Sequence, residues 1–132
     1  MCKNGFKSKP IKTLKSLSLR LSGMRLTEIF EIEVDGETAT ICYYRLNYRD
    51  GEEKKELISQ KAIPATEAVV FLNQINVGAW DGFYGEHPKY VTDGEMFLLK
   101  AVVDGKTIRA EGSQNFPPHY HDLKKWLYNL TR

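Results

Sequence analysis

Three histidines and an aspartate are the residues whose types most directly suggest chemistry. His119, His121 and Asp122 lie close together in the sequence, and His87 precedes them in a separate stretch. Imidazole nitrogens and carboxylate oxygens are good zinc ligands, and three such ligands with a water make a catalytic centre. If this stretch begins a helix, however, His119 and His121 point in nearly opposite directions, because ligands on one helix face need a spacing of three or four. A metal-dependent enzyme is therefore the least favoured hypothesis, and no cofactor is expected.

Nucleophilic and nucleotide chemistry have even less support in the sequence. Cys42 falls in an expected strand, where a thiol usually acts as a small hydrophobe, and Cys2 is too close to the terminus to be held in a site. Ser113 lacks the two flanking glycines of a nucleophile elbow. No glycine-rich phosphate-binding loop occurs. Together these patterns weigh against an enzyme.

Two loops, Trp80–Lys89 and Gly112–Tyr120, hold the other candidate residues and flank one expected hairpin. In one interpretation their aromatic rings pack together and close an end of the sheet. In the other, they line a shallow pocket in which polar side chains and free amides at a helix start bind a small anion or a peptide terminus. The candidate ligand-binding residues are Trp80, Asp81, Phe83, Ser113, Gln114, Asn115, Phe116 and Tyr120.

The motifs in these loops resemble those of a family of small bacterial proteins of unassigned function. Its members share a Trp-Asp-Gly-Phe loop, an Asp-Gly before a strand, a hairpin, and a Gly-Ser-Xaa-Xaa-Phe/Tyr-Pro-Xaa-Xaa-Tyr/Phe segment opening the last helix. The corresponding positions in this chain are 80–83, Asp93-Gly94, Asp104-Gly105 and 112–120. The resemblance covers roughly residues 17–130 and implies no activity. It implies that the two loops act together, either in folding or in binding.

The elements that position these loops follow from hydrophobic periodicity. Alternation of apolar and polar residues predicts half-buried strands, and it begins at Leu17, Leu19 and Leu21. Further strands are expected over 27–34, 37–48, 54–60, 95–103 and 106–111. Apolar residues three and four apart predict one helix after Pro64 and another after Pro117-Pro118.

Turn signals complete the expected topology. Asp-Gly pairs at 35–36, 50–51 and 104–105 predict tight hairpins, with Asp35 and Gly36 as the two positive-φ residues of a type I′ turn. Residues 77–92 lack periodicity and are expected to form a loop. The sequence therefore predicts an α+β fold, with an antiparallel sheet of about six strands (β-β-β-β-α-β-β-α) and two helices packed on one face.

Length and composition set the broad class. The 132 residues suffice for one domain, and 42% hydrophobic with 27% charged residues excludes a wholly disordered, collagen-like or coiled-coil chain. A basic N-terminal arm over 1–14, whose order the sequence leaves open, is expected to precede a single α+β domain over 15–132. Two unpaired cysteines and no long apolar stretch favour a cytoplasmic protein without a membrane contact.

Net charge and the positions of the strand tyrosines limit the kinds of partner that the sequence predicts. A net charge of +2 is too small for a general nucleic-acid field, and Tyr43 and Tyr44 fall on opposite strand faces, so only one can join a base-stacking platform. Nucleic acid is therefore a disfavoured partner. The favoured hypothesis is a non-catalytic protein-interaction or homo-oligomerising module, using a sheet face or the end marked by Trp80 and Phe116. A small-ligand site between the two loops is the alternative.

Overall fold

The structure, a computed structural model, describes residues 10–23, 26–89 and 94–132. Cys2, the lysines at positions 3, 7 and 9, Arg25 and Asp93 lie outside the described residues. Within them are two α-helices, α1 (Ala65–Gln74) and α2 (Tyr120–Leu130), and a short 3-10 helix, η1 (Val77–Trp80). The strands of this part of the chain are β2 (Leu14–Ser22), β3 (Thr27–Asp35), β4 (Thr38–Arg49), β5 (Glu52–Pro64), β6 (Phe83–Gly85), β7 (Met96–Val103) and β8 (Lys106–Ser113).

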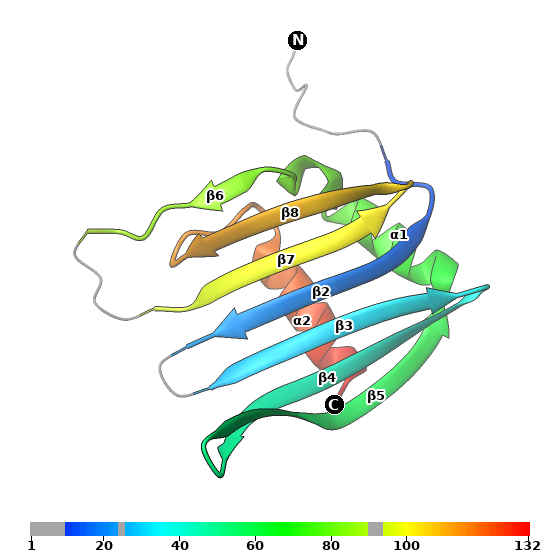
Figure 1. The fold of residues 1–132 in the computed structure, drawn as a ribbon. Helices are drawn as coiled ribbons and strands as arrows, with labels where there is room; N and C mark the ends of the chain where they lie inside the picture. Colours follow the sequence, from blue (N-terminus) through cyan, green and yellow to red (C-terminus); the bar gives the residue numbers. More distant parts are fainter. Residues whose placement is uncertain (1–9, 24–25, 90–93) are drawn as a thin grey trace.

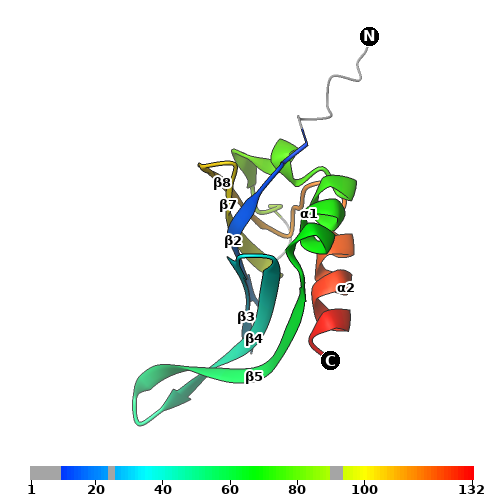
Figure 2. The ribbon, with the colours of Figure 1, turned by 90° about the vertical axis from the view of Figure 1, so that its right-hand side faces the viewer.

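These strands form one sheet in the order β5-β4-β3-β2-β7-β8-β6 (Figure 1). Both helices lie on the same side of it (Figure 2), so the α+β prediction is confirmed. The predicted antiparallel sheet of about six strands is confirmed only in part: the described sheet is mostly antiparallel, but it has seven strands, and β6 pairs parallel with β8. Residues 83–85, expected in a loop, form β6. Three residues are too few to show a periodicity, and their partner lies far along the chain.

Tight turns join β3 to β4, β4 to β5 and β7 to β8, where the Asp-Gly pairs predict them. Asp50 and Gly51 both have positive φ, and Arg49 pairs with Glu52, which is the expected type I′ geometry. The first turn differs. Asp35 still pairs with Thr38, so the two loop residues are Gly36 and Glu37, and only Gly36 has a positive φ. A type II′ turn needs glycine at its first central position, which explains the one-residue shift.

The core fills the space between the sheet and the helices. Alternation places Leu17, Leu19 and Leu21 on this covered face, where each is almost fully buried. Residues from the predicted arm join the same core. Ile11 is buried, and its backbone N–H and C=O are bonded to the Asn73 side chain of α1. The packed domain therefore includes residues before position 15.

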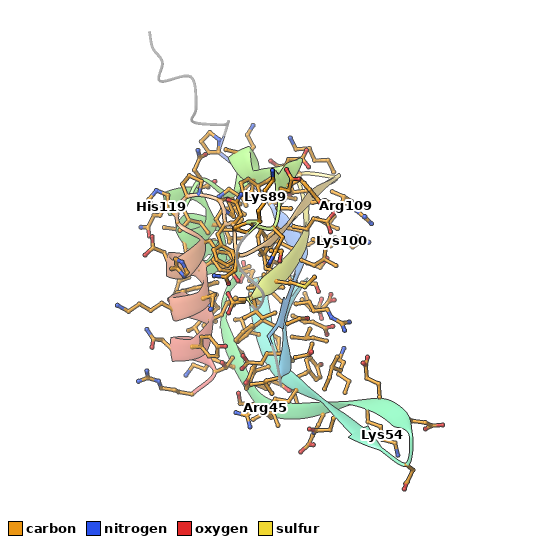
Figure 3. The ribbon with its side chains drawn as sticks, turned by 90° about the vertical axis from the view of Figure 1, so that its left-hand side faces the viewer. Arg45, Lys54, Lys89, Lys100, Arg109 and His119 are labelled. Carbon is orange, nitrogen blue, oxygen red and sulfur yellow. The ribbon has the colours of Figure 1, made fainter. Side chains whose placement is uncertain are left out.

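One hairpin leaves the body of the sheet. Pairing of β3 with β4 stops at Glu28 and Arg45, but β4 and β5 remain paired to Arg49 and Glu52. The tip bends away from the helices (Figures 2 and 3). Strand β5 is an edge strand, and its register breaks beside Ile58, which forms a bulge.

Among the described residues, no helix has the length and apolarity to cross a bilayer.

Candidate functional site

The Trp80–Lys89 loop is built mainly by packing against the sheet. Trp80 is only 2% exposed and belongs to the core. The following two residues attach the loop to β8: the Gly82 N–H donates to the Arg109 carbonyl over 2.8 Å, and the Arg109 N–H donates to Asp81 Oδ1 over 3.2 Å. These bonds set the start of β6 beside β8. The Asp81 carboxylate is therefore held in place at the sheet edge, where it accepts a backbone N–H of β8.

The Gly112–Tyr120 loop carries its rings to the same end of the sheet. Phe116 stacks on Tyr120 with centroids 4.4 Å apart, and both rings contact Phe97 of β7. Phe83 of the other loop also lies against Phe97, with ring centroids 6.2 Å apart. Tyr120 is 1% exposed. Phe83, Phe116 and Tyr120 thus form one packed cluster around Phe97. Trp80 and Tyr120 offer almost no surface to a ligand.

The polar residues between these rings are held by close backbone contacts. A Cβ atom at Gly85 or at Gly112 would collide with the Asn115 carbonyl oxygen, so both positions require glycine where Asn115 crosses the end of the sheet. Gln114 bonds to the Glu95 backbone twice, through its own N–H and through its side-chain Oε1. Gln114 and Asn115 therefore fix the loop, which favours the folding interpretation of the motif.

The histidines are dispersed over the surface. His119 occupies the N-cap position of α2 without a side-chain capping hydrogen bond, and its Nδ1 lies 3.0 Å from Asp122 Oδ2. His121 lies edge-on to the Phe116 and Tyr120 rings. His87 Nδ1 lies 2.6 Å from Ser113 Oγ on another part of the molecule. In the part of the chain that the structure describes, no three His, Cys, Asp or Glu side chains are grouped to hold a metal ion.

The His87–Ser113 pair lies beside a hollow on the face of the sheet opposite the helices, which we call the open face. The hollow has a volume of about 310 Å³. Its walls combine exposed apolar side chains with hydroxyl, imidazole and charged groups, a mixture typical of binding surfaces. The residues lining it are Arg20, Ser22, Tyr84, Gly85, His87, Met96, Phe97, Leu98, Glu111, Gly112 and Ser113.

The middle of the open face is crossed by one row of paired residues, which we call the central row. Leu98 pairs with Arg20 on one side and with Glu111 on the other, so two opposite charges flank one apolar side chain. No hydrogen bond or ion pair joins either charged group to another described residue. In strand order the row is Ile29 (β3), Arg20 (β2), Leu98 (β7), Glu111 (β8) and Tyr84 (β6).

The open face is strongly exposed for a surface so rich in apolar groups. Tyr84 is 71% exposed, Met96 54% and Leu98 44%. Lys100 and Arg109 are neighbours on β7 and β8 and point outward from this face (Figure 3). A soluble domain usually covers such apolar side chains unless they serve as a contact surface.

The carboxylates between the sheet and the helices are instead hydrogen-bonded to other side chains of the chain. Glu28 accepts hydrogen bonds from the Tyr128 and Tyr43 hydroxyls, and Glu95 accepts one from the Tyr120 hydroxyl. Burial, and next the hydrogen bond to its carboxylate partner, raises the pKa of Tyr120 and of Tyr128 above the ordinary value of 10.0. These groups tie α2 to the sheet and are structural.

Sequence reasoning selected the loops and missed the central row. Ser113 and His87 were both candidates, but for different chemistries, and the structure brings them together. The Asp104-Gly105 turn does predict that Leu98 lies opposite Glu111. Placing Arg20 beside them needs the pairing of β2 with β7, which no local pattern indicates.

Comparisons with known proteins supply no relative. No family model, no curated protein and no solved structure matches the chain. The resemblance to small bacterial proteins therefore stays a prediction.

Proposed function

We propose that the protein is a non-catalytic interaction module whose contact surface is the open face of its sheet. The observation that carries the proposal is the gathering of Tyr84, Met96 and Leu98 on this one uncovered face. Exposed apolar groups bordered by polar residues are typical of protein contact surfaces. Arg20 and Glu111 add charges that a partner can pair.

The projecting hairpin supports the same surface. Its tip extends past β3 and bends to the open side of the sheet (Figure 2). An arm of this kind adds contact area to a partner seated on the open face without changing the core. Residues Glu52 to Ile58 of the arm are all exposed.

The test compares the open face with the helix surface in cells. Two variants are made in a Cys2→Ser, Cys42→Ala background, Lys100→Cys on the open face and the matched control Lys125→Cys on α2. Both lysines are exposed. A permeant maleimide should modify the Lys100→Cys protein several-fold more slowly in cells than in dilute purified form. The Lys125→Cys protein should react equally in both. If the Lys100→Cys protein reacts as fast in cells as in dilute purified form, as the Lys125→Cys protein should, the proposal is wrong.

A small-ligand site is the second candidate, favoured by the hollow and by the hydrogen bond between His87 and Ser113 at its side. Its ligand would contact Ser113, whereas the aromatic loop residues stay in the core. Native mass spectrometry of protein purified without chelators should then show a retained mass that Ser113→Ala abolishes. The matched control Ser18→Ala, which lies on β2 away from the hollow lining, should keep it. Wild-type protein with no added mass contradicts this candidate.

A further inference from the structure

We infer that the partner of the open face is a second copy of this chain, packed face to face. The inference rests on the proposed function and names its partner. Its basis is the charge order along the central row, where the arrangement of residues is complementary to itself.

The central row spans five neighbouring strands, with β7 in the middle. Leu98 of β7 has a cation, Arg20, on one side and an anion, Glu111, on the other. Beyond the charges lie Ile29, which its own chain leaves only 9% exposed, on one side and the strongly exposed Tyr84 on the other. If the row is turned end for end about Leu98, the cation takes the place of the anion, and one apolar end takes the place of the other.

A two-fold axis between two copies, directed along β7, makes this reversal. It places Leu98 against the partner's Leu98, Arg20 against the partner's Glu111, and Tyr84 against the partner's Ile29. The Arg20–Glu111 and Tyr84–Ile29 contacts then each occur twice and the Leu98–Leu98 contact lies on the axis, as in the isologous interfaces of most homodimers. Two sheets packed in this way match aligned sheet packing, with strand directions within about 30°.

The size of this surface fits a reversible contact. Strands about 4.8 Å apart with residues about 3.3 Å apart give the five strands a flat footprint of roughly 500–600 Å² per copy. Specific complexes bury about 800 Å² of accessible surface per partner. The uneven surface of the side chains adds to this flat footprint. The β4–β5 hairpin, which passes the β6 edge of the other copy in this arrangement, adds further contact. Together they bring the accessible surface buried per copy into that range. We therefore expect a dimer that dissociates on dilution.

The test uses charge reversal and restoration between chains. Sedimentation velocity from micromolar to millimolar concentration should show wild-type protein passing from monomer to dimer. Arg20→Glu alone sets Glu against Glu, and Glu111→Arg alone sets Arg against Arg, so each should weaken the dimer by on the order of tenfold or more. An equimolar mixture of the two variants should associate again, because one chain then carries both anions and the other both cations.

Controls separate a surface effect from a folding effect. Lys125→Glu changes the charge of an exposed α2 residue and should leave the dimer unchanged. Circular dichroism should show that both reversal variants remain folded, since Arg20 and Glu111 are exposed.

Two results would overturn the inference. One is a wild-type chain that stays monomeric at every concentration. The other is a mixture of the reversal variants that stays as weak as either variant alone. If the Lys100→Cys protein is nevertheless protected in cells, the open face binds a different chain, and only the identity of the partner is wrong. If that protection is also missing, the proposed function itself fails.

Discussion

The two faces of the sheet use the same residue types in different ways. On the covered face, the Glu28 and Glu95 carboxylates each accept two or more donors from tyrosine or lysine side chains. On the open face, Arg20 and Glu111 flank Leu98 without a partner among the described residues. The covered face is therefore complete within one chain. The open face has charges and apolar groups available for something outside it.

Adjacent leucines on β7 give the largest contrast. Leu99 is fully buried, whereas Leu98 points to the open face. We expect Leu99→Ala to lower the free energy of unfolding by about 3–5 kcal/mol through a cavity, and Leu98→Ala to change it by less than about 0.5 kcal/mol. Urea denaturation at a concentration where the chain is monomeric measures both. Similar losses for the two variants would mean that both faces are buried in the monomer.

The second largest effect is expected at alkaline pH, which should lower the free energy of unfolding through the tyrosines of the covered face. The pKa values of Tyr43, Tyr120 and Tyr128 are raised in the folded protein, mainly by burial. Their contribution to stability is complete below the unfolded value of about 10, and it is lost as the pH rises above that value towards the folded pKa, with a slope of at most about 1.4 kcal/mol per pH unit for each phenol.

The check is the free energy of unfolding measured between pH 8 and pH 11. Stability should be level up to about pH 10 and then fall. The free energy of unfolding of the Tyr128→Phe variant should fall less steeply, because one of the phenols with a raised pKa has been removed. A decline that begins well below pH 10, or an unchanged slope in the variant, would contradict the assignment.

Two glutamates on β3 give the smallest contrast. Glu28 accepts the Tyr128 hydroxyl over 2.6 Å under α2, and Glu31 pairs with Lys55 over 2.8 Å on the open side. Glu28→Gln should cost about 1–2 kcal/mol, because hydrogen bonds to a partly buried charge are lost. Glu31→Gln should cost less than about 1 kcal/mol, as exposed ion pairs do. Thermal denaturation of the two variants compares them directly. Equal losses in the free energy of unfolding would contradict the distinction between the two faces.

Local patterns explain which parts of the fold could be predicted. Alternation at Leu17, Leu19 and Leu21 and the Asp-Gly turns act over a few residues, so they identify strands and hairpins. Strand β6 has no such pattern because its three residues are ordered by β8, which lies about 25 residues later. The pairing of β2 with β7 is also non-local, and it alone completes the central row.

The candidate site shows the same limit. A sequence indicates that two loops are rich in aromatic residues, but it does not show whether the rings pack on each other or surround a ligand. Phe116 and Tyr120 stack on each other, and Gly85 and Gly112 leave just enough room for Asn115. Packing of this kind depends on distances between segments, which composition and spacing do not contain.

The bulge beside Ile58 has a consequence for how the protein behaves when concentrated. A regular edge strand offers a template on which further chains can add without end, as in amyloid fibrils. Strand β5 interrupts that template at Ile58 and carries charged residues along its outer half, and the opposite edge, β6, is only three residues long. Growth from either edge is thereby blocked, so crowded solutions of this protein should remain clear where a flat-edged sheet would gel.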